Sequence, residues 1–312
     1  MKTVGLIGGS GFIGSHTTKQ FLEQGYHVKV SATDISKPEK YEHLKQLPNA
    51  KHLEIVPLKV ENKEQLKKFI SGCEIVVHGG TPFKLDFEDA KAELFDPTIK
   101  GTENFLEIIN QSKEVKKVVF IASIAAYNTD FPMPPGHKNP EDTFNENDTP
   151  FTSEASHPYA QAKFIANQTV SKFIQDHPNL SFEISSVSPV FVTGKPLSNR
   201  EDSTSAGMQF LFKNKIAPNP FVQMLYDTDA EFAMVDVKDV SQAIFKSGTT
   251  KGLHGKNYIL SSESWKVSDI SAMLNNETPK GKAKMFYQND AAKQDLGIHF
   301  NPAHVPLKNF SA

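Results

Sequence analysis

The stretch VGLIGGSGFIGSH, residues 4–16, decides how the rest of the chain is read. It reads as a short apolar strand, then a glycine turn, then the start of a helix. The glycines fit two registers, which begin at Gly8 or Gly9 and share Gly11 and Gly14. In this arrangement the backbone comes close to a pyrophosphate, and the free N–H groups of the helix bind it. The stretch therefore predicts a dinucleotide-binding turn, with a glycine turn that holds no ligand as the alternative.

Apolar runs alternate with helix-like stretches as far as residue 190, which is the pattern of parallel βαβ units. Beyond Phe191 the alternation fails. The expected strands are 3–8, 27–32, 52–58, 74–80, 115–123 and 181–190. Helices are expected at 38–47, 63–72 and 88–111, a long loop at 128–158, and irregular chain at 193–207.

These elements predict an α/β protein built on a Rossmann-type doubly wound parallel sheet, with a small C-terminal substrate lobe. We assign the dinucleotide-binding domain to residues 1–190 plus 234–261. The substrate lobe takes residues 191–233 plus 262–312.

Composition excludes several classes of function. A net charge of −2 gives no basis for binding nucleic acid or an anionic membrane, and no apolar run approaches the roughly 20 residues of a membrane helix. Cys73 is the only cysteine, which excludes an internal disulfide and a cysteine metal cluster. The histidines show no helical metal-ligand pairing, and His78 and His157 read as structural or surface groups. We expect a cytoplasmic protein without a metal.

A second stretch, SHPYAQAKFIANQ at 156–168, places Tyr159 four residues before Lys163. On a helix these two positions lie on one face, a turn apart. A neighbouring ammonium lowers the pKa of a phenol, and such a tyrosine can act as a general acid or base. The spacing alone is not decisive, because Tyr41 and Lys45 repeat it in YEHLK.

The order of the motifs along the chain resembles that of a known family. The glycine turn is followed by FIASIAAY at 120–127 and YAQAK at 159–163. Further matches are GCEIVVHGGTPF, DPTIKGTENFLEII, SPVFVTG and FAMVDVKDVSQAI, so the resemblance spans residues 1–262. The chain resembles the extended short-chain dehydrogenase/reductases, and within them most closely the dihydroflavonol-reductase group of NAD(P)-dependent epimerase/dehydratase proteins.

The resemblance implies a catalytic set of Ser123, Tyr159 and Lys163. Ser123 ends the expected fifth strand, and the tyrosine and lysine lie on the helix after it. Tyr41 and Lys45 come after the second strand and are therefore expected to be an ordinary exposed helix pair. In this interpretation Tyr159 is the general acid or base, and Ser123 stabilises charge on the substrate oxygen.

The cofactor is expected to be NADP(H) in preference to NAD(H). An NAD site usually has an acid at the end of the second strand, where this chain has Ala32, and Asp34 lies just beyond. Thr33 stands where many NADPH-using relatives carry an arginine. Thr33, Lys37 and Lys40 could contact a 2′-phosphate. The alternative for the two lysines is that they are solvated loop groups. The expected cofactor-binding residues are Gly8, Ser10, Gly11, Phe12, Ile13, Gly14, Thr33, Lys37, Val60, Gly79, Gly80, Thr81, Tyr159, Lys163, Pro189 and Val192.

The expected activity is reduction of a small aldehyde or ketone to an alcohol. The substrate is expected to contact Phe83, Ser123, Tyr127, Phe191 and Met224, and for the aromatic and Met positions core packing is the alternative. A nucleotide-sugar epimerase or dehydratase is a second candidate, although Arg200 is the only arginine available to hold a diphosphate. A third is a dinucleotide-binding redox sensor without turnover.

Members of the family that this chain resembles commonly pair through two long helices, here around residues 88–111 and 159–176. The resemblance therefore predicts a homodimer.

Overall fold

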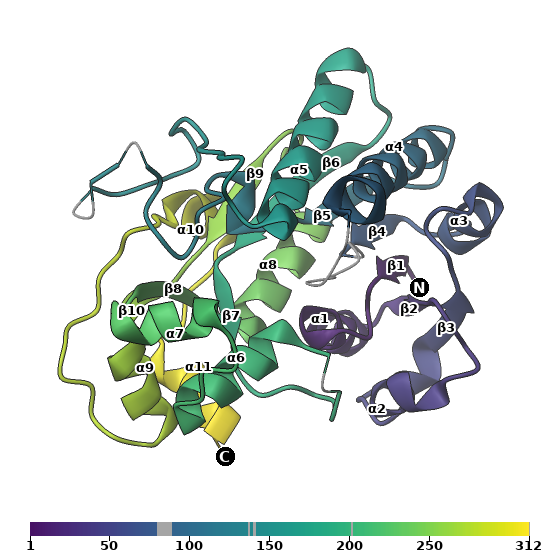
Figure 1. Ribbon diagram of the computed structural model, residues 1–312. Helices are drawn as coiled ribbons and strands as arrows, with labels where there is room; N and C mark the ends of the chain where they lie inside the picture. The colour runs from purple at the N-terminus through teal and green to yellow at the C-terminus, as the bar shows by residue number, and fades with distance from the viewer. Residues whose placement is uncertain (80–88, 137, 140–141, 201, 312) are drawn as a thin grey trace.

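A computed structural model describes residues 1–79, 89–136, 138–139, 142–200 and 202–311 of the chain. Its centre is a seven-stranded sheet in which every neighbouring pair is parallel, in the order β3-β2-β1-β4-β5-β6-β9 (Figure 1). The chain order reverses between β1 and β4, and this position is where ligands bind in open α/β sheets. The strands are β1 (Thr3–Ile7), β2 (His27–Ala32), β3 (Leu53–Pro57), β4 (Ile75–His78), β5 (Lys117–Ile121), β6 (Glu183–Pro189) and β9 (Asn257–Leu260). The predicted Rossmann-type sheet is confirmed.

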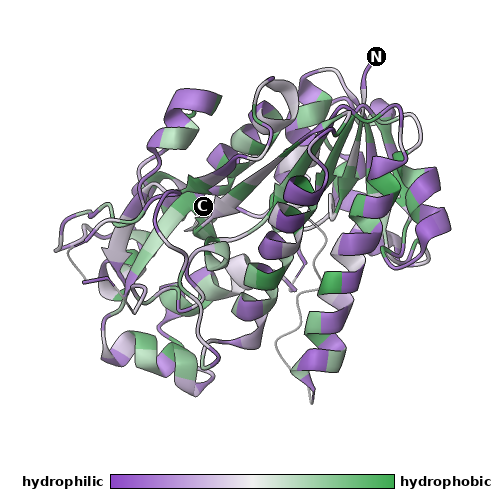
Figure 2. Ribbon diagram, turned by 90° about the horizontal axis from the view of Figure 1, so that it is seen from above, coloured by the Kyte–Doolittle hydropathy of each residue, from purple (hydrophilic) through white to green (hydrophobic). Residues whose placement is uncertain are grey.

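Helices cover both faces of this sheet. One face carries α1 (Phe12–Glu23) and α8 (Val237–Thr249), which pack against each other. The other carries α3 (Lys63–Ile70), α4 (Asp96–Asn110) and α5 (Pro158–Asp176), with α4 against both of its neighbours. Figure 2 shows strands that are largely apolar and, around them, helices in which polar and apolar residues alternate.

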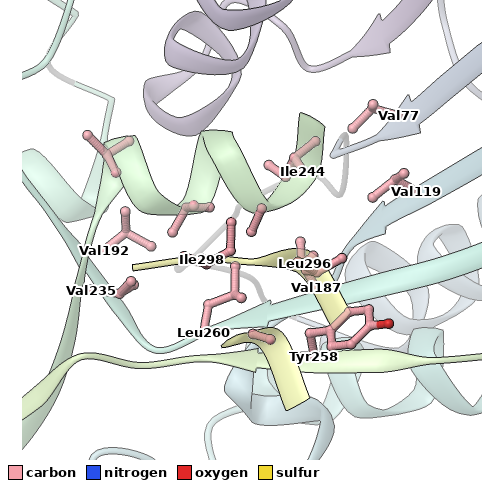
Figure 3. Close-up of a cluster of buried hydrophobic side chains, with 14 of the residues drawn as sticks. Val77, Val119, Val187, Val192, Val235, Ile244, Tyr258, Leu260, Leu296 and Ile298 are labelled. Atoms are coloured by element: carbon pink, nitrogen blue, oxygen red, sulfur yellow. The ribbon is translucent and has the colours of Figure 1, made fainter. Parts of the chain in front are cut away.

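Two hydrophobic cores result, because successive side chains of a strand point to opposite faces. On β4, Ile75 and Val77 join the core beneath α1 and α8, and Val76 joins the core beneath α3, α4 and α5. Figure 3 shows the first core, with Ile244 of α8 among the side chains of the strands. Strands buried on both faces read as continuous apolar runs, which explains why their positions follow from the sequence.

A second, three-stranded sheet lies in the C-terminal half, in the order β10-β8-β7. It contains β7 (Phe191–Thr193), β8 (Glu231–Asp236) and β10 (Glu263–Lys266), and its helices are α6 (Thr204–Asn214), α7 (Pro220–Asp227), α9 (Val267–Leu274) and α11 (His304–Ser311). The segment around α10 (Asp290–Leu296) instead packs on the main core, through Leu296 and Ile298. The predicted division into 1–190 plus 234–261 and 191–233 plus 262–312 stays a prediction.

Several helices differ from their expected bounds. The described part of the predicted helix 88–111 is a π-helical turn, η3 (Lys91–Phe95), that leads into α4. The predicted helix 38–47 is a 3₁₀ turn, η1 (Pro38–Lys40), and a four-residue α2 (Glu42–Lys45), because Tyr41 interrupts it. The irregular stretch 193–207 ends early, because Ser203 caps α6 by accepting a hydrogen bond from the Ala206 N–H (3.2 Å).

The expected exposed pair of Tyr41 and Lys45 is wrong for Tyr41, whose side chain is 5% exposed. Leu44 of the same short helix is fully buried in the main core, which turns this segment inward. Lys45 is exposed and pairs with Glu42. Among the described helices, none combines the length and the apolar character that crossing a membrane requires.

Candidate active site

The glycine turn after β1 has geometry that only glycine allows. Gly8 has φ +84°, and its N–H donates to Ser31 Oγ (3.0 Å). A Cβ on Gly14 would lie 2.0 Å from the Gly8 carbonyl oxygen, and a Cβ on Gly9 would lie 2.9 Å from Val30. The positive φ calls for glycine at residue 8, the close contact with Val30 of β2 favours it at residue 9, and the approach of α1 to the turn requires it at residue 14.

The turn suits the diphosphate of a dinucleotide. The helix α1 begins at Phe12, and its cap residue Gly11 has no side chain to satisfy the N–H groups of the first turn. These N–H groups have no acceptor within the helix, and the first turn has no acidic residue to repel an anion. The residues present therefore fit a bound dinucleotide.

Tyr159 and Lys163 lie one turn apart near the start of α5. The Lys163 Nζ is 5.8 Å from the centre of the Tyr159 ring, and the Lys163 side chain is 7% exposed. His157 caps the helix, with its Nδ1 accepting from the Tyr159 N–H (3.2 Å), and Pro158 occupies the first turn. This cap fixes where α5 starts, and with it the register that places Tyr159 and Lys163 on one face of the helix, with Lys163 buried beside the ends of β4 and β5.

Burial sets the electrostatics of this pair. Desolvation lowers the pKa of Lys163 to about 8, and it raises the pKa of Tyr159 above its ordinary value. The pKa of Tyr159 shifts in the opposite direction to the one expected from the neighbouring cation, because burial removes the phenol from water. Tyr159 is therefore neutral at pH 7 and holds a proton that it can donate.

Ser123 follows β5 and caps the short 3₁₀ turn η4 (Ile124–Ala126). Its Oγ accepts a hydrogen bond from the Ala125 N–H (3.2 Å), and it is partly exposed. That bond uses an acceptor site of the hydroxyl and leaves its proton to be donated elsewhere. The helix α5 packs against η4, which brings the helix of Tyr159 to the end of β5.

His78, at the end of β4, is the residue whose position the sequence did not reveal. Its imidazole is 7% exposed and packs on the rings of Phe105 (4.5 Å) and Phe120 (5.3 Å). Burial and the Lys163 ammonium lower its pKa to about 4, so the ring is neutral. Among the described residues its Nε2 has no hydrogen-bond partner. The only signal was a histidine in an otherwise apolar strand.

A cavity of about 20 Å³ joins His78 to Lys163. Thr102, Asn167 and Ala122 complete much of its wall. This volume is enough for one water molecule, and the site is polar enough to hold it. Lys163 therefore lies between the ends of β4 and β5, beside the point where the strand order reverses. In the part of the chain that the structure describes, no group of three His, Cys, Asp or Glu side chains could hold a metal ion.

Other expected cofactor residues lie along the same edge. Gly79 follows β4, and a Cβ there would lie 2.9 Å from the terminal methyl of Ile121, which would have to shift. Pro189 ends β6, and Val192 is buried on β7. Gly80, Thr81 and Phe83 lie outside the described residues.

The residues expected to select the cofactor lie after β2 and β3. Thr33 and Lys37 are exposed, and Val60 is partly buried. Asp34 Oδ1 accepts hydrogen bonds from the N–H (3.0 Å) and the hydroxyl (2.6 Å) of Ser36, and Asp34 Oδ2 lies 3.9 Å from the Lys37 Nζ. The roles of these residues stay predictions.

The expected substrate wall is less well supported. Tyr127 is 7% exposed in the main core, with its ring 6.1 Å from that of Phe144. Phe191 packs on Phe232 (5.6 Å), and Met224 packs on the same cluster in the small lobe. These contacts favour the core-packing alternative, and a substrate role for the three residues stays a prediction.

Comparison with known proteins assigns the family. A sequence profile of the NAD dependent epimerase/dehydratase family matches residues 4–260. The chain belongs to this family. Among curated members, a cinnamoyl-CoA reductase of Medicago truncatula is 27% identical over 97% of this chain and 92% of that protein. An anthocyanidin reductase of Vitis vinifera is 26% identical over 95% of this chain and 87% of that protein.

Solved structures share the epimerase/dehydratase fold. The yeast methylglyoxal/isovaleraldehyde reductase complexed with NADPH has a TM-score of 0.80 and 21% identity, over 99% of this chain and 97% of that one. A UDP-glucose-4-epimerase of Stenotrophomonas maltophila has a TM-score of 0.78 and 15% identity, over 100% and 97%. The fold thus accommodates reductases and epimerases alike. Like its reductase relatives, this chain is an NAD(P)-dependent oxidoreductase of the extended short-chain dehydrogenase/reductase type.

Proposed function

We propose that this member of the epimerase/dehydratase family is an NADP(H)-dependent reductase that converts a small aldehyde or ketone to an alcohol, with Tyr159 as the general acid. The observation that carries the proposal is the position of Tyr159 and Lys163, one turn apart on α5, with Lys163 inserted between the ends of β4 and β5. This is the edge of the sheet that the glycine turn also faces.

The chain's own residues supply proton transfer and orientation. When bound, the cofactor supplies the hydride that goes to the carbonyl carbon. Tyr159 donates its phenolic proton to the carbonyl oxygen, and the raised pKa keeps that proton in place at neutral pH. Ser123 donates its hydroxyl hydrogen to the same oxygen, since its Oγ already accepts from the Ala125 N–H. The Lys163 ammonium stabilises the phenolate left behind.

A preference for NADP(H) is supported by the residues after β2. The acid expected of an NAD site is absent at Ala32, and one oxygen of the Asp34 carboxylate, Oδ1, is engaged by Ser36. Lys37 and Lys40 remain in this segment to balance a 2′-phosphate. The yeast methylglyoxal/isovaleraldehyde reductase that shares the fold is complexed with NADPH.

The position of Arg200 weighs against a nucleotide-sugar epimerase. The only arginine of the chain contacts Ser10 in the glycine turn and pairs with Asp202. Although Arg200 belongs to the segment assigned to the small lobe, its guanidinium is directed at the glycine turn, so it is not positioned to hold the diphosphate of a sugar-nucleotide substrate. A redox sensor would not need Ser123, Tyr159 and Lys163 at one edge of the sheet.

The test follows NADPH absorbance with a panel of carbonyl compounds that includes methylglyoxal, isovaleraldehyde and an aromatic aldehyde. We expect oxidation of NADPH with at least one of them, and a higher kcat/KM with NADPH than with NADH. Tight binding of NADPH without oxidation by any compound of the panel would instead favour the sensor.

A further inference from the structure

The loop between β7 and α6 returns to the glycine turn. From this loop the Arg200 Nη1 donates to Ser10 Oγ (3.2 Å) and lies 3.4 Å from the Ser10 carbonyl oxygen. The two residues are 190 positions apart in the chain. The only guanidinium of the protein is therefore directed at the turn that faces the cofactor's phosphates.

Asp202 fixes the orientation of this guanidinium. The Arg200 Nε donates to Asp202 Oδ1 (2.9 Å), and Nη2 donates to Asp202 Oδ2 (2.5 Å). A two-point contact of this kind holds the planar group rigidly. It leaves Nη1 as the nitrogen that faces the turn. The Arg200 side chain is 24% exposed, so the group is shielded yet reachable by a ligand.

A cavity of about 80 Å³ lies between this loop and the start of α1. Gly11 and Phe12 line it from the turn, and Ser198 and Arg200 line it from the loop. It is several times larger than the roughly 15 Å³ that one water needs. The N–H groups of the first turn and the guanidinium thus border one space from opposite sides.

Positive charge near this space extends toward the segment after β2. Burial lowers the pKa of His43 most, and Arg200 lowers it further. The pKa of Asp202 is lowered chiefly by its hydrogen bond with Arg200, with a smaller contribution from Lys40. His43 in turn contacts Ser15 of α1 through its Nε2 (2.9 Å). Arg200 therefore lies within electrostatic reach of two places where a dinucleotide carries phosphate, the diphosphate over α1 and the 2′-phosphate beyond β2.

We propose that Arg200 is a phosphate-binding residue for the dinucleotide, delivered by the loop after β7. On binding, Nη1 exchanges the two Ser10 oxygens for phosphate oxygens, and Asp202 keeps the guanidinium oriented. The inference rests on the dinucleotide binding in the proposed function.

Because the chain has a single arginine, one chemical probe reports on this residue alone. Phenylglyoxal modifies arginine selectively, and peptide mapping separates modification at Arg200 from that at the N-terminal amine. We expect NADPH to slow modification of Arg200 by about tenfold or more, the protection that a ligand well above its Kd provides. Modification at an unchanged rate with saturating NADPH overturns the proposal.

Calorimetry on variants identifies the phosphate. We expect Arg200→Met to weaken NADPH binding by about tenfold or more, and Arg200→Lys to weaken it less because the charge remains. Lys195→Met removes one positive charge from the same loop at an exposed side chain, and it should change the Kd less than twofold. Circular dichroism and Tm confirm that each variant is folded.

The two cofactors separate the outcomes. If Arg200→Met weakens NADPH and leaves NADH unchanged, the phosphate is the 2′-phosphate; if both weaken equally, it is the diphosphate. Either result supports the role of Arg200, and unchanged affinity for both overturns it. If the unaltered protein binds neither dinucleotide, the proposed function itself fails, which is a different result from a variant that binds as well as the parent.

Discussion

The Lys163 ammonium lies 5.8 Å from the centre of the Tyr159 ring, and both groups are largely withdrawn from water. Their burial shifts the two pKa values in opposite directions, lowering that of the lysine and raising that of the tyrosine. This arrangement keeps the phenol protonated, as a general acid requires, while the ammonium remains charged at neutral pH.

Replacing the phenol should therefore remove turnover and spare binding. We expect Tyr159→Phe to lower kcat by about 10²–10⁴-fold, the usual contribution of a general acid, with the Kd for NADPH nearly unchanged. Tyr26→Phe is the matched control, because Tyr26 packs its ring on Phe21 away from the active-site edge. Equal kcat in Tyr159→Phe and the parent would refute the general-acid role.

The pH dependence should report on Lys163. Its pKa of about 8 predicts that kcat for reduction falls as the pH rises through this value, because the neutral amine no longer stabilises the phenolate. Initial rates between about pH 6 and pH 10 measure this, a range around the ordinary and shifted lysine values. A rate that stays constant across that range would assign the charge stabilisation to another group.

Lys163 should also make the free energy of unfolding depend on pH, and this quantity should rise with pH where kcat falls. Between about pH 8 and the ordinary value of 10.5, the unfolded chain binds more protons at this lysine than the folded chain, so the free energy of unfolding rises with pH. Lys163→Met removes this slope and should stabilise the protein at pH 7 by about 1–3 kcal/mol, while NADPH binding is lost. The exposed Lys172→Met on the same helix should change stability by no more than about 0.5 kcal/mol. Urea unfolding of both variants, with and without NADPH, makes the comparison.

Alanine substitutions at two glycines of the turn should have different effects, one on stability and the other on NADPH binding. Gly14→Ala places a Cβ 2.0 Å from the Gly8 carbonyl oxygen, so α1 must shift and stability should fall by about 3 kcal/mol or more. At Gly11 the contact of a Cβ with the same oxygen is an ordinary 3.5 Å, so Gly11→Ala should fold with nearly normal stability. We expect it to weaken NADPH binding instead, because the side chain obstructs the approach of the diphosphate. Urea unfolding and calorimetry on the pair distinguish the two effects; similar stability loss in both would contradict the assignment.

The C-terminal segment is tied to the start of α8 by one asparagine. The Asn301 amide donates to Asp236 (3.1 Å) and Asp239 (3.0 Å), and its backbone N–H donates to Asp239 (2.7 Å). Both carboxyl groups are buried, and burial raises the pKa of Asp239 to about 7. Asn301→Ala should cost about 1–3 kcal/mol, because two buried acceptors lose a donor.

The pH dependence checks this account of Asn301. A carboxyl whose pKa is raised from 3.8 to about 7 on folding binds more protons in the folded state, so its contribution to stability declines as the pH rises through that interval. The Asn301 donor matters most when the Asp239 carboxyl is ionised. The stability lost in Asn301→Ala should therefore be larger at about pH 8 than at about pH 5 in urea unfolding. A loss that is the same at both values would mean that the asparagine acts only through packing.

The sequence by itself determined the sheet, the glycine turn and the spacing of Tyr159 and Lys163. These features depend on residues close to each other in the chain. Apolar patterning predicts the strands, the glycines predict the turn that admits no Cβ at Gly14, and one helical turn separates Tyr159 from Lys163. The length of the helix after β2 was missed, because Tyr41 and Leu44 are drawn inward by the core, which is not a local property.

Only the tertiary structure decided the electrostatics of the site. His78 read as a structural histidine in an apolar strand, and its place beside Lys163 arises because β4 ends next to a helix from much later in the chain. Arg200 contacts Ser10 across 190 positions of the chain, because the loop between β7 and α6 packs beside the glycine turn. The direction of the Tyr159 pKa depends on how much water the fold excludes, and burial is a property of the packed chain that no local spacing contains.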